Sequence, residues 1–193
     1  MLTLYFSPGS SSMAVHIALH EIGVDFERRL VSLAKREQFA PEYLAINREA
    51  KVPTLMIDGR ALTEVAAILY YLAKRYPEKG LWPDGDLETE ARAISWMSFI
   101  ASTIHPARRI GIERWREVFG LAEQRLGGRE WALKRYSVAD IHLFRLFWRF
   151  VDSVKPAAGE FPGLSAHYGR MMARPAVQKT LEIESAIGFQ LPQ

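Results

Sequence analysis

Hydrophobic and polar positions follow two different periods along this chain, and the change comes before its middle. Near the start, Leu2, Leu4 and Phe6 alternate with Thr3 and Tyr5. A period of two is typical of a β-strand with one buried face. In the later part of the chain the apolar positions recur only at helical spacing. The pattern predicts a mixed α/β region followed by an all-helical region.

The first region is predicted to run strand–helix–strand–helix–strand–strand–helix. Gly23 follows the first helix and suits a left-handed C-terminal position. Asp58-Gly59 is a two-residue hairpin signal between the last two strands. The expected strands are Leu2–Phe6, Phe26–Val31, Thr54–Ile57 and Arg60–Leu62, and the expected helices are Ser11–Ile22, Glu37–Ile46 and Glu64–Tyr76. This order, within eighty residues, is that of a thioredoxin-like layer.

The second region is predicted to hold helices only. Val138–Val154 is apolar nearly all round, which indicates a buried core helix. Ser137 and Asp140 have the spacing of a capping box at its start. The other expected helices are Leu87–Ile104, Glu113–Leu126, Gly163–Ala173 and Pro175–Ile187. We therefore expect a thioredoxin-like domain over 1–77, a Pro- and Gly-rich linker over 78–86 and an all-helical domain over 87–193.

Composition narrows the chemistry. Among the 193 residues there is no cysteine, which excludes disulfides, thiolate metal sites and a catalytic cysteine, and is compatible with a reducing cytoplasm. The net charge of +3 is too small to indicate a nucleic-acid partner. No apolar run is long enough to span a membrane, and no signal peptide is apparent. His16 and His20 lack a third ligand, so no metal site is expected. We favour a solvated helix face over a site for acidic ligands for the arginines at 108, 109, 114 and 116.

The first strand is followed by Ser7-Pro8-Gly9 and then by Ser10, Ser11 and Ser12, where a helix must begin. Unpaired N–H groups and the helix dipole stabilise an anion at such a place. If the anion is a thiolate, its pKa falls and it becomes a better nucleophile at neutral pH. A plain helix cap remains the alternative, although three serines in a row cannot all cap.

A second feature is Val52-Pro53 at the start of a predicted strand. Proline donates no ladder hydrogen bond, so the backbone of Val52 is left to pair with an added extended peptide. The pattern by itself does not decide whether this bond is cis, since cis is uncommon even before proline.

These features together resemble the glutathione transferases, and the bacterial beta class most closely. The resemblance covers nearly the whole chain. It rests on Tyr5-Phe6-Ser7-Pro8-Gly9, Leu44-Ala45-Ile46-Asn47, Val52-Pro53, Leu62-Thr63-Glu64, Trp96 with Phe99-Ile100-Ala101-Ser102 and His105, Tyr136-Ser137-Val138-Ala139-Asp140, and Ala173-Arg174-Pro175-Ala176-Val177.

The resemblance implies an enzyme that binds glutathione as co-substrate, with no metal, and transfers it to a small hydrophobic electrophile held between the two domains. It further implies a cytoplasmic homodimer with a role in detoxification. Catalysis would involve Ser11, with Ser10 as the runner-up, and His105, for which capping of a helix end is the alternative. Glutathione would be held by the backbone of Val52, with Pro53 cis, by Glu64 and Val65, and by Lys35 or Arg36, for which a solvated face is an open alternative.

Three departures from the beta class bear on mechanism. Ser11 stands where that class usually has a cysteine, so mixed-disulfide chemistry is not carried over. Phe6 stands where the family has a tyrosine. The stretch from His105 to Ser137 is shorter than expected, and Pro106 replaces a common lysine. The missing cysteine and the shortened segment motivate one alternative, a non-catalytic glutathione-binding protein of the same fold. The sequence does not separate a second alternative, a glutathione-dependent isomerase.

Overall fold

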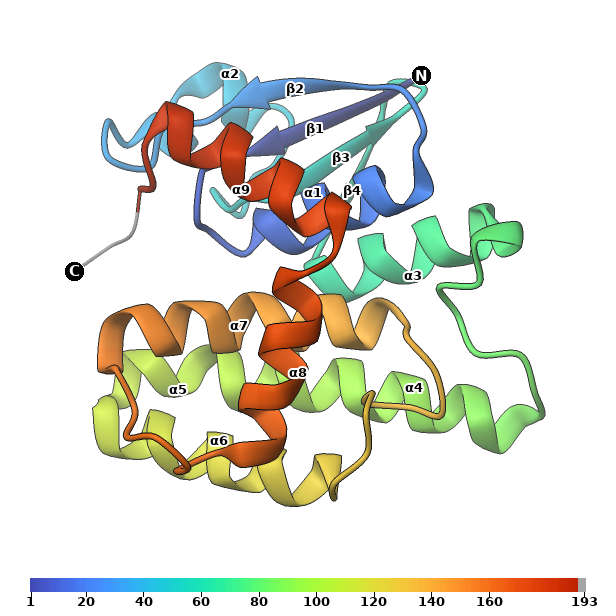
Figure 1. Ribbon diagram of the computed structural model, residues 1–193. Helices are drawn as coiled ribbons and strands as arrows, with labels where there is room; N and C mark the ends of the chain where they lie inside the picture. The colour runs from blue at the N-terminus through green and yellow to red at the C-terminus, as the bar shows by residue number, and fades with distance from the viewer. Residues whose placement is uncertain (191–193) are drawn as a thin grey trace. The chain divides into compact units, whose positions relative to one another are not determined.

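The computed structural model describes residues 1–190 of the chain (Figure 1). Two compact units are present: Met1–Leu72 with the segment beginning at Pro175 form the first, and Ala73–Arg174 form the second. The first unit is thus built from both ends of the chain. The domains predicted from the sequence, 1–77 and 87–193, are continuous segments, whereas the first unit joins two separate segments of the chain.

A four-stranded mixed sheet forms the centre of the first unit. Its strands are β1 (Leu2–Phe6), β2 (Phe26–Leu30), β3 (Thr54–Ile57) and β4 (Arg60–Thr63), in the order β2-β1-β3-β4. Strand β2 runs parallel to β1, while β3 is antiparallel to both β1 and β4. Leu4 and Leu55 are paired and fully buried, as the alternating pattern predicted. The predicted α/β region with four strands is confirmed.

The helices of the first unit are α1 (Ser12–Ile22), α2 (Pro41–Leu44), the first part of α3 (Val65–Arg75) and α9 (Pro175–Ile187). Helix α9 packs against α1. The single helix expected over Glu37–Ile46 is instead a 3₁₀ turn, Glu37–Phe39, followed by α2. Pro41 explains the break, because Ala40 before it adopts an extended conformation with φ −65° and ψ 141°.

The second unit is helical: α4 (Leu87–Phe99), α5 (His105–Ile110), α6 (Ile112–Leu126), α7 (Val138–Val154) and α8 (Pro162–Met172), preceded by a 3₁₀ turn at Pro77–Lys79. Helix α7 is its core, since every residue from Val138 to Phe150 is buried. Phe119 of α6 lies 4.6 Å from Phe150 between ring centroids, and 5.2 Å from Phe147. The all-helical prediction for this region is confirmed.

The long helix expected over Leu87–Ile104 is divided. A π-helical turn, Ile100–Ile104, separates α4 from α5, and the N–H of His105 donates to the carbonyl of Ile100, five residues back. Pro106 accounts for the irregularity, because it has no N–H and its ring conflicts with regular helix four residues earlier. Within residues 1–190, no helix is long and apolar enough to span a membrane.

Candidate active site

The serine turn after β1 is held together by its own hydroxyl groups. The Ser12 hydroxyl accepts the N–H of Ser7 and donates to the carbonyl of Ser7, both at 3.1 Å. It also lies 2.7 Å from the Ser10 hydroxyl, which accepts the N–H of Ser12 at 3.2 Å. Both side chains are buried. The hydroxyl groups of Ser10 and Ser12 therefore serve to hold the shape of the turn.

Ser11 differs from its neighbours in exposure and in partner. Its side chain is half-buried, and its hydroxyl donates to the carbonyl of Val52 at 3.0 Å. Its backbone is already helical, with φ −59° and ψ −18°, and its side chain caps nothing. Among the described residues, its N–H donates to no acceptor. Ser11 thus presents a hydroxyl and a backbone donor together at the start of α1.

The Val52–Pro53 peptide bond is cis, as the resemblance implied. The carbonyl of Lys51 beside it accepts from the Tyr43 hydroxyl at 2.5 Å and from the Asn47 amide at 2.9 Å. Both side chains also bond the Thr54 hydroxyl at 3.0 Å. Burial raises the pKa of Tyr43, which therefore stays a neutral donor. Asn47 is the last residue of the motif Leu44-Ala45-Ile46-Asn47 and Tyr43 directly precedes that motif. Their hydrogen bonds to the backbone beside the cis bond are seen only in the fold.

Glu64 has an unusual backbone. Its φ is 67°, in the left-handed region that non-glycine residues seldom occupy and that is concentrated at functional sites. As a consequence α3 begins at Val65, one residue later than expected. The Glu64 side chain is 63% exposed, and one carboxylate oxygen lies 3.9 Å from the Lys51 ammonium. The carboxylate is therefore available at the start of α3.

Lys35 and Arg36 lie in the loop after β2, and both are exposed. The Lys35 N–H donates to the Ser32 hydroxyl at 3.2 Å, which shapes the loop. The Arg36 guanidinium lies 5.1 Å from the Phe39 ring centroid. The structure brings Ser11 and Val52 into direct contact. The contacts given for Lys35 and Arg36 are with Ser32 and Phe39, and they do not assign either cation to a ligand.

Helix α9 and the residues after it form hydrogen bonds with the serine turn from the far end of the chain. Glu184 is fully buried; one oxygen accepts the N–H of Gly9 at 2.7 Å and the other lies 2.8 Å from Nδ1 of His16. The Gln190 side-chain oxygen accepts from the Ser7 hydroxyl at 3.3 Å, and the Gln190 N–H donates to the carbonyl of Pro8 at 2.9 Å. Sequence reasoning missed Glu184 and Gln190, because neither belongs to a motif.

His105 belongs to the second unit, where it is exposed in the first turn of α5. No group of three or more metal-ligating side chains occurs among residues 1–190. The rings of His16 and His20 lie 4.7 Å apart between centroids and are tilted by 41°, but Nδ1 of His16 is bonded to Glu184 and Nδ1 of His20 to Thr180.

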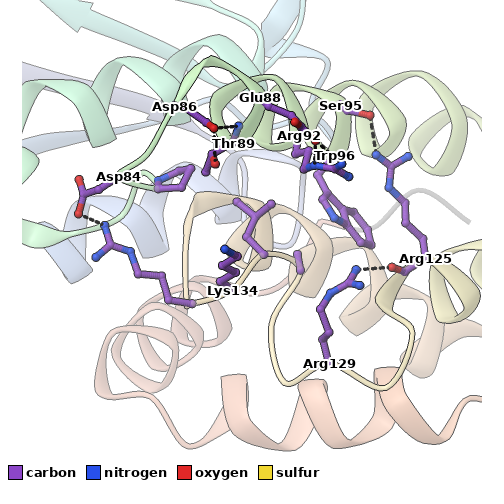
Figure 2. Close-up of a pocket in the computed structure, with 14 residues that line it drawn as sticks. Asp84, Asp86, Glu88, Thr89, Arg92, Ser95, Trp96, Arg125, Arg129 and Lys134 are labelled. Carbon is purple, nitrogen blue, oxygen red and sulfur yellow. Dashed lines mark hydrogen bonds and ion pairs between the residues drawn. The ribbon is translucent and has the colours of Figure 1, made fainter.

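A cavity of about 850 Å³ lies in the second unit beside the start of α4 (Figure 2). The Arg125 guanidinium covers Trp96 at 4.7 Å from the ring centroid and donates to the Ser95 hydroxyl at 2.6 Å. Burial and the charge of Arg129 lower the pKa of Arg125. The cavity contains none of the predicted site residues.

Comparison with known proteins bears on both units. The glutathione S-transferase N-terminal domain family matches residues 4–80, and the glutathione S-transferase C-terminal domain family matches residues 103–175. The glutathione S-transferase GstA of Escherichia coli O157:H7 is 30% identical over 202 residues, which cover 95% of this chain and 98% of that protein. The chain belongs to the glutathione S-transferase family.

Solved structures of glutathione S-transferases agree over nearly the whole length. A sphingomonad glutathione S-transferase complexed with glutathione is 35% identical, with a TM-score of 0.85, and covers 95% of this chain and 98% of its own. A bacterial beta class glutathione S-transferase from Sphingomonas chungbukensis is also 35% identical, with a TM-score of 0.85 over 94% and 98%. The fold, and the assignment of the chain as a glutathione transferase, are therefore shown.

Proposed function

We propose that the protein binds glutathione on its first unit, stabilises the thiolate and transfers it to a small electrophile. The observation that carries the proposal is the contact between the Ser11 hydroxyl and the Val52 carbonyl, beside the cis bond. A peptide backbone paired with Val52 would have its side chain close to the start of α1. For glutathione that side chain is the thiol of the central cysteinyl residue.

Ser11 takes the role of thiolate donor in this proposal. A serine hydroxyl without a base is a poor nucleophile, so it does not attack the electrophile itself. It turns from Val52 to the sulfur when the cysteinyl N–H occupies the Val52 carbonyl. A hydrogen bond to the charged form lowers the pKa of the thiol. The N–H of Ser11 and the dipole of α1 act in the same direction.

The other ends of glutathione are assigned to charged groups. Glu64 binds the γ-glutamyl ammonium, because its exposed carboxylate can accept a charge-assisted hydrogen bond. Val65, the first residue of α3, completes this part of the site. Lys35 or Arg36 holds the glycyl carboxylate from the loop after β2. His105, in the second unit, is kept as a candidate catalytic residue. We place the protein in the cytoplasm, consistent with a chain that lacks cysteine.

Two measurements test this proposal. Calorimetry should give a glutathione dissociation constant in the low-to-submillimolar range, or roughly −4 to −6 kcal/mol. The pKa of the bound glutathione thiol is then read from the thiolate absorbance against pH. In Ser11→Ala it should rise by about one to two units, since a hydrogen bond to a charged group contributes ~1.5–3 kcal/mol. Turnover should fall and glutathione affinity should stay close to that of the parent.

Ser10→Ala is the matched control, because the Ser10 hydroxyl bonds within the turn. A shift in Ser10→Ala with none in Ser11→Ala would move the assignment to Ser10. No shift in either would leave the stabilisation to the backbone N–H groups alone. Absence of both heat and competition on a glutathione resin would reject the glutathione site itself.

We also propose a homodimer. On the sequence alone, Trp96 and Phe99 are the apolar side chains expected at its interface, but Trp96 is only 3% exposed and lies under Arg125. Leu87 and Ile94 on α4 supply apolar surface instead, with 82% and 53% of their surfaces exposed. Light scattering at micromolar protein should give twice the 22.0 kDa chain mass. Ile94→Lys should lower the measured mass toward that of a single chain. A parent that is monomeric would overturn the proposal.

A further inference from the structure

The side chain of Gln190 joins two segments of the first unit that are far apart in the chain. Its oxygen accepts from the Ser7 hydroxyl at 3.3 Å, from the Ser32 hydroxyl at 3.2 Å and from the N–H of Ala34 at 3.2 Å. The backbone N–H of Gln190 donates to the carbonyl of Pro8 at 2.9 Å. All of these residues belong to the first unit. One oxygen atom therefore connects the serine turn after β1 with the loop after β2.

Both hydroxyl groups depend on this oxygen. Ser7 is fully buried and Ser32 is 3% exposed, so water has little access to either side chain. Among residues 1–190, Gln190 is the acceptor that the structure gives to each of the two hydroxyls. A buried O–H without an acceptor costs free energy. The two segments are therefore stabilised in the arrangement in which the oxygen of Gln190 reaches both.

The Ser32 hydroxyl extends this contact to Lys35. A hydroxyl has one proton and two lone pairs, so a hydroxyl that donates to Gln190 can still accept a hydrogen bond. The Ser32 hydroxyl accepts the N–H of Lys35 at 3.2 Å. The orientation that Gln190 gives to this hydroxyl therefore determines whether the N–H of Lys35 has its acceptor.

Helix α9 makes a second contact with the serine turn and thereby holds Gln190 in place. The helix packs against α1 (Figure 1), and its fully buried Glu184 accepts the N–H of Gly9 at 2.7 Å. The other carboxylate oxygen of Glu184 lies 2.8 Å from Nδ1 of His16 on α1. A buried carboxylate is costly to leave without partners. These contacts therefore fix the last turn of α9, which leads directly to Gln190.

We propose that Gln190 is a positioning residue of the glutathione site, because it holds the turn that binds the thiolate and the loop that binds the glycyl carboxylate in one arrangement. The inference rests on the proposed function, which assigns Ser11 to the thiolate and Lys35 or Arg36 to the carboxylate. A hydrogen bond weakens steeply as its angle departs from linear, so a displaced turn raises the thiol pKa. A displaced loop weakens binding of the glycyl end.

Gln190→Met tests both effects, because it removes the oxygen and keeps the side-chain length and the backbone N–H. The thiol pKa of bound glutathione, read from the thiolate absorbance, should rise by about half a unit. The dissociation constant of glutathione should rise about fivefold, and that of γ-glutamylcysteine, which lacks the glycyl residue, should rise less. The matched control is Gln178→Met, since Gln178 is exposed on α9, and it should change none of these values. Equal losses for the two ligands at an unchanged thiol pKa would overturn the inference.

Two further variants separate the two effects. Ser7→Ala should raise the thiol pKa and leave the ratio of the two dissociation constants near that of the parent, because Ser7 belongs to the serine turn. Ser32→Ala should change that ratio and leave the thiol pKa near that of the parent, because Ser32 belongs to the loop. They also decide the matter if Gln190→Met does not fold. The reverse pattern, or a change in neither quantity, would contradict the proposal.

Amide hydrogen exchange, followed by NMR, tests the connection without glutathione. In Gln190→Met the amide of Ala34 should exchange faster because it loses its acceptor, and that of Lys35 should follow because the Ser32 hydroxyl is no longer oriented. Both amides should be unchanged in Gln178→Met. If this holds while the parent binds no glutathione, the connection between the two segments stands and the proposed glutathione function fails. Unchanged exchange at both amides would overturn the inference.

Discussion

The three consecutive serines have different hydrogen-bond partners, so a shift of one residue along the chain changes what a serine can do chemically. Ser10 and Ser12 bond one another and their own backbone, while Ser11 points to the Val52 carbonyl. The sequence placed a helix start here and identified Ser11 as the leading candidate, with Ser10 close behind. It could not separate them, because the choice depends on where the first helical φ and ψ values fall, and that depends on the packing of the turn.

Ser12→Ala should lower the free energy of unfolding by about 1–3 kcal/mol, because the buried N–H of Ser7 loses its acceptor. Ser11→Ala should cost less than about 1 kcal/mol, because its half-buried hydroxyl makes one hydrogen bond that water can replace. Urea denaturation followed by circular dichroism measures both. Equal effects in the two variants would contradict the division of roles within the serine turn.

At the scale of elements, local signals predicted what local contacts determine. The capping box at the start of α7 is present: the Ser137 hydroxyl accepts the N–H of Ala139, and Asp140 accepts the N–H of Ser137 at 2.9 Å. The break within Leu87–Ile104 was missed because the helical pattern continues through it. Pro106 was visible in the sequence, but the extra residue that it forces into the preceding turn was not inferred.

Ser137→Ala should destabilise the protein by about 1 kcal/mol or more, because α7 loses a cap at a fully buried end. Asp140→Ala should cost more, since Asp140 also accepts the N–H of Ala132 at 2.7 Å and bonds Nε2 of His167 at 3.1 Å. Melting temperatures of the two variants check the order. Glutathione affinity of the folded fraction should be little changed, and an unaltered melting temperature in Ser137→Ala would show that the cap is unimportant.

At the scale of the whole molecule, the part that the sequence could not predict is the return of α9 to the first unit. Gly9 and Glu184 are 175 residues apart, and no periodicity relates them. The strands, α1 and α7 were predictable because each buries a face that its own pattern displays. The supports of the serine turn were not, because a single buried glutamate or glutamine has no pattern, and only the tertiary fold shows which N–H it accepts.

The pH dependence of stability should report two histidines, the half-buried His20 in the first unit and the buried His142 in the second. Burial lowers the pKa of His20 to about 4, with His16 adding to the effect, and burial lowers that of His142 to about 3. In the unfolded chain both titrate near 6.5. Between about pH 4 and 6.5 the unfolded state therefore binds more protons than the folded state, and the free energy of unfolding falls as the pH falls.

Each histidine should contribute a slope of at most about 1.4 kcal/mol per pH unit in this window and none well above it. Urea unfolding at steps from pH 4 to 8 measures the slope in the parent, in His20→Gln and in His142→Gln. Each variant should have a shallower slope below pH 6.5 and match the slope of the parent from pH 7 to 8. Carboxylates with lowered pKa values, such as Glu160, also destabilise the protein in acid, so the difference between variant and parent isolates the histidine. Identical slopes in all three proteins would mean that these histidines become protonated in the folded state as readily as in the unfolded chain.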